Sequence, residues 1–392
     1  MSVLPTIDEA LALVLARVAP LPAENVSIAQ AAGRVLAEAA VARIDLPPFD
    51  SSAMDGFAVR AADTPGRLTV VGQSAAGSPA DRELGAGEAI VISTGAVVPA
   101  GADAVVPVER TTGDVEVERV ALGDNVRPRG GDVRAGAVVA GGGSFLTPAR
   151  VGALAAAGVA AVRCRRRPRV TVLATGSELR PPGEPLAPGE IYESNSVLLG
   201  AQLASAGAVV TVLDPVGDDA AATRAALERG LEGDVLVTSG GVSVGPHDLV
   251  RGALADLGAE EVLWRVAVKP GKPVAFAVRG ATLVFGLPGN PVSSLVDFEL
   301  FVRPALLALQ GAREPGPAYL PGRLGSPLRR NEHRDELVRA RTRVERDAVV
   351  LEPLRGQESH MIVRSAEASA LVLVPHGVGA VPEGAPVRYL TL

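Results

Sequence analysis

Cysteine is nearly absent from this 392-residue sequence. Cys164 is the only one, and the four histidines are far apart along the chain. A single cysteine cannot form an internal disulfide, and scattered histidines do not give the spacing of a zinc site. These absences exclude a disulfide framework and a zinc finger.

Long apolar runs and an excess of basic residues are missing too. No stretch approaches the ~20 apolar residues that cross a bilayer, and the start carries Asp8 and Glu9 where a signal peptide carries basic residues. Lys and Arg total 38 against 44 for Asp and Glu, a formal net charge of −6. The sequence therefore predicts a cytoplasmic protein with neither a membrane nor a nucleic-acid partner.

Lysine is the most informative scarcity. All but two of the 38 basic residues are arginine, and both lysines, Lys269 and Lys272, fall within residues 268–273. Lysine is a compact, rotatable cation that can lose its proton when buried, whereas arginine is a planar fork that keeps its charge. We interpret these two positions as requiring ammonium groups.

The chain begins with a helical pattern and continues with short strands. Thr6 and Glu9 match a capping box ahead of an apolar stripe, which predicts a helix to about Val18. Residues 44–131 carry short alternating runs broken by Gly, Pro and Asp, which predict a small β domain.

A second helix is predicted to begin at Thr147 and Pro148, because proline is favoured at the first helical position. We expect this helix to pack on the first one. The β domain would then be inserted into a helical domain made of residues 1–43 and 132–167.

Residues 168–312 alternate between strand and helix patterns. Three strand–helix units in series predict an α/β domain with a parallel sheet, and ligands of such sheets bind beyond the carboxyl ends of the strands. Further strands are predicted at 263–268, 273–277 and 283–285, and a long helix at about 291–309. After a proline-rich linker, alternating runs within 313–392 predict a C-terminal β barrel. The expected fold class is multidomain α/β.

Glycine-rich turns follow two of the predicted strands. In residues 238–248 a strand runs into glycines and hydroxyls before a helix, which suits an anion such as phosphate. A tight connection with Asp248 as partner of the helix dipole explains the same pattern. Residues 286–294 repeat the arrangement, and helix capping alone would also explain them. With Lys269 and Lys272 nearby, the second turn would bind a doubly charged tetrahedral oxyanion.

Several carboxylates follow the same strands. Glu178, Asp218 and Asp248 together could hold Mg²⁺, which prefers carboxylate and phosphate oxygens. Glu178 also fits a capping box, and Asp218 alone fits a helix N-cap. In the inserted β domain, Asp55 fits either a functional site or an Asx turn.

These strings jointly resemble the molybdopterin molybdenumtransferase (MoeA) family, which is related to the catalytic domain of gephyrin. The resemblance rests on SAMDGFAVR (52–60), STGA (93–96), RGGD (129–132), TGSE (175–178), TSGGVSVG (238–245), KPGKP (269–273) and GLPGNPVS (286–293). In the predicted barrel it rests more weakly on Arg339 and residues 357–360. The resemblance implies a molybdopterin-binding-like α/β domain.

It also implies that molybdenum from molybdate is inserted into adenylylated molybdopterin, with Mg²⁺-dependent release of AMP. The family's molybdate-binding positions fall on Lys269, Lys272, Ser293, Arg339 and Ser359. Those for Mg²⁺ and adenylate cleavage fall on Asp248, Glu178 and Asp218. Further substrate contacts are implied at Thr175, Ser239, Gly240, Gly241 and Ser243.

The resemblance implies a homodimer as well. Asp55, Thr94 and Asp132 of the lid-like β domain and its junction would face the site across a dimer cleft. The implied pathway partners are the molybdopterin-adenylylating enzyme and molybdopterin synthase.

Two other functions remain open. One is the sibling enzyme that adenylylates molybdopterin from ATP, but that enzyme is a single domain without a lid or a barrel. The other is a gephyrin-like scaffold that binds a partner peptide, and the retained carboxylates and lysines favour catalysis over it. A nicotinamide enzyme is disfavoured because no G-x-G-x-x-G follows the first strand of the α/β domain.

Overall fold

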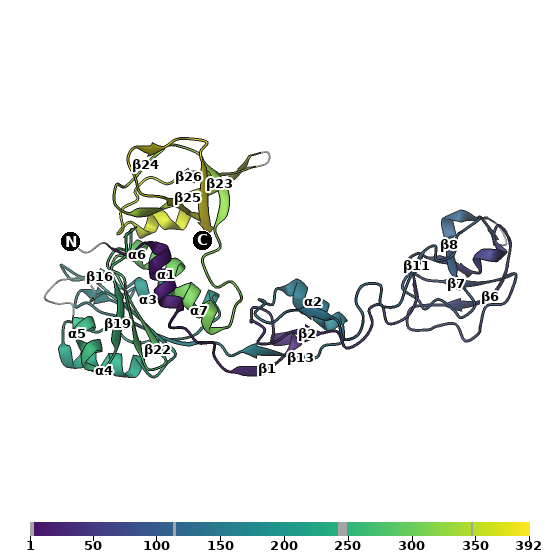
Figure 1. Ribbon diagram of the computed structural model, residues 1–392, viewed down its shortest axis with the longest axis horizontal. Coiled ribbons are helices and arrows are strands. Elements are labelled where there is room, and N and C mark those ends of the chain that lie inside the picture. The colour runs from purple at the N-terminus through teal and green to yellow at the C-terminus, as the bar shows by residue number, and fades with distance from the viewer. Residues whose placement is uncertain (1–3, 113–114, 242–248, 346–347) are drawn as a thin grey trace. The chain divides into compact units, whose positions relative to one another are not determined.

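The computed structural model describes residues 4–112, 115–241, 249–345 and 348–392 (Figure 1). The chain divides into two compact units. Unit 1 comprises Met1–Glu24 and Arg165–Leu392, and unit 2 comprises Asn25–Cys164. Strands β1 (Ala23–Ser27) and β13 (Ala161–Arg165) carry the chain from one unit to the other. Within the described ranges, no helix has the length and apolar character needed to span a membrane.

A six-stranded sheet forms the centre of unit 1. Its order is β17 (Val209–Val212), β14 (Arg169–Ala174), β18 (Val235–Ser239), β22 (Thr282–Leu287), β21 (Ala275–Arg279) and β19 (Glu260–Trp264). The first four strands are parallel, which confirms the prediction, while β21 is antiparallel to both its neighbours. In register, Ala174 pairs with Ser239 and Ser239 with Leu287, so three strands end at one carboxyl edge.

Helices connect and cover these strands. They are α3 (Asn195–Ser205), α4 (Ala220–Gly230), α5 (Leu249–Asp256), α6 (Pro291–Asp297), the π-helical turn η4 (Phe298–Val302) and α7 (Arg303–Leu309). The predicted helix over 291–309 is present, with the wider π turn in its middle. The N-cap of α4 is Asp219, whose Oδ1 accepts the Ala222 N–H at 2.7 Å. The interpretation of Asp218 as that cap is wrong by one residue.

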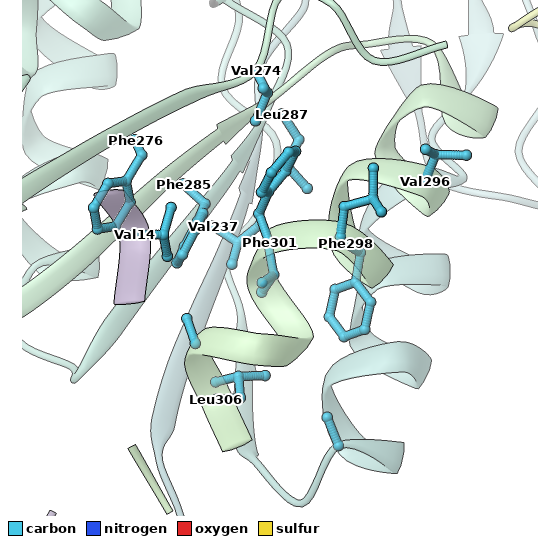
Figure 2. Packing of buried hydrophobic residues seen from close by; sticks show 14 of the residues in the cluster. Val14, Val237, Val274, Phe276, Phe285, Leu287, Val296, Phe298, Phe301 and Leu306 are labelled. Atoms are coloured by element: carbon cyan, nitrogen blue, oxygen red, sulfur yellow. The ribbon is translucent and has the colours of Figure 1, made fainter. Parts of the chain in front are cut away.

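The core of unit 1 lies between the sheet and the helices (Figure 2). The rings of Phe276 and Phe285, on adjacent strands, have centroids 4.9 Å apart, and Val14 of α1 (Ile7–Leu15) belongs to the same cluster. The capping box predicted for α1 is confirmed, because the Glu9 N–H donates to Thr6 Oγ1 and the Thr6 N–H donates to Glu9 Oε2.

The expectation that the first two helices pack together is wrong. Helix α1 packs against α7 and β19 in unit 1. Helix α2 (Pro148–Ala156) begins at its predicted cap, Thr147, but packs in unit 2 against β12 (Val138–Ala140) and the 3₁₀ turn η1 (Ile28–Gln30). Ile7, Ala10 and Val14 of α1 are buried in the core of unit 1, which gives this helix its packing partners there.

Unit 2 contains the short strands predicted for residues 44–131. A four-stranded sheet has the order β6 (Thr69–Ser74), β7 (Glu88–Ile92), β4 (Gly56–Val59) and β8 (Ala104–Pro107). Smaller ladders join β5 (Gly66–Arg67), β10 (Glu116–Val117) and β9 (Thr111–Thr112), then β3 (Ser51–Ser52) with β11 (Val126–Arg127), and β2 (Ala40–Val41) with β12. A Cβ on Gly56 would lie 2.0 Å from the Val106 carbonyl oxygen, so β4 and β8 require glycine there.

The C-terminal region of unit 1 is the predicted barrel. Five strands close on themselves: β25 (Asp335–Glu345), β26 (Ala348–Pro353), β23 (Leu320–Leu324), β29 (Pro386–Thr391) and β27 (Ala370–Val374), with β27 returning to β25. Shorter elements are β15 (Leu179–Arg180), β16 (Ile191–Tyr192), β24 (Leu328–Arg329), β28 (Ala380–Val381) and the 3₁₀ turns η2 (Ala61–Asp63), η3 (Val108–Arg110) and η5 (Ile362–Glu367).

A sixth strand joins the barrel from the α/β domain. Strand β20 (Val268–Lys269) runs parallel to the start of β25, with Lys269 opposite Glu336. The single strand predicted over 263–268 is therefore wrong, because β19 ends at Trp264 and Arg265 has φ +69°. A positive φ at a non-glycine residue interrupts the extended conformation.

Candidate functional site

A pocket of about 480 Å³ lies where the α/β domain meets the barrel within unit 1. We call it the lysine pocket. It is lined by Lys269, Pro270, Gly271, Lys272, Pro273, Pro288, Asn290, Ser293, Arg334, Gln357, Glu358, Ser359 and His360. The Val292 N–H donates to the Ser359 carbonyl at 3.1 Å, which fixes this barrel segment on the start of α6.

The two lysines of this pocket differ in their surroundings. Lys269 Nζ lies 3.1 Å from Glu336 Oε1, so its charge is compensated. Lys272 is exposed, and the described part of the chain offers it no ion-pair partner. Arg334, which sequence reasoning missed, adds a half-buried guanidinium that likewise has no carboxylate partner among the described residues. The pocket thus holds two cations, Lys272 and Arg334, that have no ion-pair partner among the described residues, and its lining also includes the exposed carboxylate of Glu358.

Arg339, expected beside the oxyanion, does not line this pocket. It is fully buried, and its guanidinium donates to the carbonyls of Met361 (2.6 Å) and Gly356 (2.7 Å) and to Ser365 Oγ (2.9 Å). Burial lowers the pKa of Arg339. Its donors hold the segment that carries Ser359, so in this structure Arg339 acts on the pocket through that segment. The family resemblance could not predict that Arg339 contacts this segment and not the pocket, because the position of a residue on a strand does not tell where its long side chain points.

A second pocket, of about 280 Å³, lies at the carboxyl ends of β14, β18 and β22. We call it the strand-end pocket. It is lined by Ala174, Thr175, Glu178, Leu179, Ile191, Tyr192, Glu193, Ser194, Asn195, Ser239, Gly289, Asn290, Pro291, His360 and Ile362. The sequence had singled out Thr175, Glu178 and Ser239 among these, and the structure brings all three to one pocket.

Asn195 ties the strand ends together. Its Nδ2 donates to Ser239 Oγ and to the Gly289 carbonyl, both at 2.7 Å. Three buried polar atoms of this region have no hydrogen-bond partner among the described residues: Asn195 Oδ1, Ser196 Oγ and Thr238 Oγ1. Buried polar atoms are nearly always paired, so this cluster retains hydrogen-bonding capacity that a polar ligand can satisfy.

Gly240 and Gly241 shape the turn after β18. They have φ +90° and +67°, and a Cβ on Gly240 would lie 2.6 Å from the Thr175 carbonyl oxygen. Both conditions favour glycine. The predicted glycines therefore have a backbone reason for their identity at the edge of the strand-end pocket.

The two pockets share a wall. Asn290 and His360 line both of them. Asn290 occupies the N-cap position of α6, yet its side chain makes no capping hydrogen bond, so side-chain capping does not explain this residue. Sequence reasoning placed neither residue in the site, although both lie within or next to the strings of the family resemblance.

The predicted Mg²⁺ carboxylates are brought together in part. Glu178 is exposed and lines the strand-end pocket, and the Asp218 N–H donates at 2.9 Å to Oγ of Ser177, the residue before Glu178. Asp248 and Ser243 lie outside the described residues. Among the described ones no cluster of three His, Cys, Asp or Glu is present. Two exposed carboxylates on adjoining loops fit the oxygen donors that Mg²⁺ prefers.

The remaining predicted residues belong to unit 2. Asp55 Oδ1 accepts the Thr94 N–H at 2.8 Å, so these two are adjacent. The Asp132 N–H donates to the Leu46 carbonyl at 2.9 Å, and the side chain is exposed. Asp55 therefore braces the turn at Thr94, a contact that the Asx-turn interpretation did not anticipate.

A largely parallel sheet has a polar pocket at its strand ends, and the barrel contributes to an adjoining cationic pocket. This arrangement defines a multidomain α/β protein with two adjoining pockets in unit 1. Family models match nearly the whole chain. They are the MoeA N-terminal region (domain I and II) over residues 5–158, the probable molybdopterin binding domain over 171–308 and the MoeA C-terminal region (domain IV) over 321–392.

Individual relatives agree with these models. The chain is 38% identical to molybdopterin molybdenumtransferase 2 of Mycobacterium tuberculosis over 94% of this chain and 95% of the relative. It is 34% identical to molybdopterin molybdenumtransferase of Bacillus subtilis, covering 94% and 90% of the two chains. A MoeA crystal structure from Pyrococcus horikoshii OT3 superposes with a TM-score of 0.83 at 28% identity, covering 99% of this chain and 100% of the other. The chain belongs to the molybdopterin molybdenumtransferase (MoeA) family.

Proposed function

We propose that the chain acts in molybdenum cofactor biosynthesis as a transferase that inserts molybdenum from molybdate into adenylylated molybdopterin and releases AMP. This is the activity for which its relatives are named, with the adenylate and Mg²⁺ details added from the resemblance. The observation that carries the proposal is the shared wall: a cationic pocket and a polar strand-end pocket meet at Asn290 and His360.

The charge of the lysine pocket supports molybdate as its ligand. Because Glu336 compensates Lys269, the uncompensated cations are Lys272 and Arg334. With the Glu358 carboxylate also in the lining, the pocket keeps a net positive charge that favours an anion, and Ser293 and Ser359 supply hydroxyl donors for its oxygens. Arg339 acts as a positioning residue that holds the Ser359 segment.

The strand-end pocket supports the nucleotide-linked substrate. Thr175, Ser239 and Asn195 offer hydroxyl and amide groups at the end of β18, beside the turn formed by Gly240 and Gly241. In this proposal Glu178 and Asp218 hold Mg²⁺, with Asp248 as the third candidate. The ion would supply positive charge to the phosphate oxygens of the adenylate.

The test is AMP release by the purified chain from adenylylated molybdopterin with molybdate and Mg²⁺. We expect release that depends on both. ATP-dependent formation of adenylylated molybdopterin would instead identify the adenylating sibling. Absence of both activities, with a folded protein, would favour the scaffold function.

The proposal includes a homodimer in which Asp55, Thr94 and Asp132 complete the site of the other subunit. Complementation tests it, because Asp55→Ala and Lys272→Ala remove residues from different units of the chain. Mixed, re-equilibrated and assayed at a low molybdate concentration, the two impaired variants would form heterodimers with one intact site and recover activity. No recovery after verified subunit exchange would contradict the shared site.

Two pathway partners and a compartment complete the proposal. The substrate must come from a molybdopterin-adenylylating enzyme, which itself depends on molybdopterin synthase, and all three would act in the cytoplasm. Faster AMP release when the adenylylating enzyme is present, at equal free substrate, would indicate direct transfer between the proteins.

A further inference from the structure

Asp297 is a buried acid that the proposed function does not use. It is the last residue of α6, where the helix widens into the π turn η4, and it is 0% exposed. Neither carboxyl oxygen has a hydrogen-bond partner among the described residues. A carboxylate buried without partners costs several kcal/mol, and such groups take up a proton instead. Burial accordingly raises the pKa of Asp297 well above its ordinary value.

The carboxyl group lies directly behind the loop that carries both lysines. A Cβ placed on Gly271 would be 2.1 Å from Asp297 Oδ1 and 2.9 Å from Oδ2, so the acid packs against the Gly271 Cα. Gly271 has φ +108°, is buried, and lines the lysine pocket between Lys269 and Lys272. One face of this glycine therefore meets the acid while the loop lines the pocket.

Few other charges belong to the elements around Asp297. Helix α6 packs against α3, β22, η4 and η5. Neither α3 nor β22 carries a charged residue. On η4, Glu299 is paired with Arg303, and on η5, Glu367 is paired with Arg341 while Arg364 is exposed. The cations nearest in sequence to Gly271, which Asp297 contacts, are the two pocket lysines.

These contacts give the loop two electrostatic states. With its proton on, Asp297 is neutral and leaves the ammonium groups to the pocket. With its proton off, the carboxylate places a negative charge behind the loop that carries both lysines, and this charge disfavours an anion in the pocket. We propose that the protonation of Asp297 is coupled to oxyanion binding in the lysine pocket. Asp297 is then a positioning residue, which acts on the ligand through the Gly271 loop.

Linkage fixes the sign of the effect. If the oxyanion binds the protonated form more tightly, oxyanion binding must raise the proton affinity of Asp297 by the same factor. Binding then takes up a proton wherever Asp297 is ionised in the free protein, and affinity falls as pH rises through that range. The inference rests on the proposed function only in taking an oxyanion as the ligand of the lysine pocket.

The experiment titrates molybdate into the full-length chain and into Asp297→Asn, by calorimetry in buffers of different ionisation enthalpy. The scan extends upward from the ordinary aspartate range, because burial raises the pKa of Asp297 well above it. We expect proton uptake by the unmodified chain and a loss of affinity of up to about tenfold per pH unit above the Asp297 pKa. Asp297→Asn, which keeps the shape without a titrating proton, would show neither effect. Glu367→Gln, a surface acid on η5, serves as the matched control and should behave like the unmodified chain.

The outcomes separate the two proposals. Molybdate binding without proton uptake by the unmodified chain, matched by Asp297→Asn, would overturn the role of Asp297 and leave the proposed function intact. Absence of oxyanion binding at every pH would overturn both. The proton count of the unmodified chain needs no variant, so the test stands even if Asp297→Asn folds poorly.

Discussion

The two ends of the parallel sheet treat buried polar groups in opposite ways. At the amino end, Asp234 precedes β18 and accepts two hydrogen bonds from the Arg166 guanidinium, both at 2.6 Å, and one from the Arg169 N–H at 2.7 Å. Burial by itself raises the pKa of Asp234, but Arg166 and the Arg169 N–H outweigh it, so the net shift is downward.

At the carboxyl end, buried polar atoms are left over. Asn195 Oδ1, Ser196 Oγ, Thr238 Oγ1 and both oxygens of Asp297 have no partner among the described residues. The comparison distinguishes Asp234, whose carboxylate is saturated and stabilises the fold, from the polar atoms of the carboxyl end, which keep unused hydrogen-bonding capacity. Exceptions to the rule that buried polar atoms are hydrogen-bonded are expected at functional sites.

The largest expected effect is at the amino end. Asp234→Ala should lower the free energy of unfolding by about 3 kcal/mol, because it leaves Arg166 and an N–H without their acceptor. Urea denaturation measures this change. AMP release per folded molecule should stay at the unmodified value, since no pocket residue changes. If fully folded Asp234→Ala released AMP more slowly than the unmodified chain, Asp234 would also serve activity and the contrast between the two ends would be wrong.

At the carboxyl end, Lys272→Ala should act on the ligand and not on the fold. We expect the molybdate concentration for half-maximal AMP release to rise about 10- to 100-fold, or about 1.4–2.8 kcal/mol, with an unchanged melting temperature. Arg343→Ala, which removes the same charge from an exposed strand of the barrel, is the control. Equal effects of the two variants would mean that only net charge matters.

Asn195→Ala should give an intermediate result, because this residue both ties strand ends and faces a pocket. Losing two hydrogen bonds should cost about 2 kcal/mol of stability. The Michaelis constant for adenylylated molybdopterin should rise as well, which steady-state kinetics would detect. A pure stability loss with unchanged kinetics would move Asn195 to the structural side of the comparison.

The smallest effects are those of pH on stability, and they should have opposite signs at the two ends. The pKa of Asp234 is lowered in the folded state, so its contribution is present above the ordinary aspartate value and is lost as pH falls through and below it. The pKa of Asp297 is raised, so folding loses stability as pH rises above the ordinary value. Each slope is at most about 1.4 kcal/mol per pH unit. Denaturation of Asp234→Asn and Asp297→Asn across pH should remove one slope each.

Local signals made much of the fold predictable. The capping box of α1, the proline start of α2 and the alternation from β14 to β18 are encoded by neighbouring residues, and all are confirmed. Partner choice is not encoded locally. Helix α1 packs on α7, almost 300 residues away in sequence. The apolar pattern of α1 predicts a buried face but does not tell whether α7 or α2 covers it.

The site was predictable to the extent that it lies in glycine-rich strings at strand ends. Thr175, Ser239 and Ser293 were predicted in this way, and Lys272 was predicted from the scarcity of lysine; all four line one of the two pockets. Arg334 was missed because one arginine among so many carries no signal. Asp297 was missed because a polar residue in a helix suggests solvent exposure, and only packing shows that it is buried without partners.

Strand β20 has a consequence for building chimeras. The proline-rich segment after α7 looks like a natural joint at which the C-terminal barrel could be exchanged between homologues. A cut there would leave the guest barrel to pair its β25 edge with a host strand that also carries Lys269. The exchangeable module therefore includes residues 268–269 together with the barrel, and a successful graft has to match both sides of that ladder.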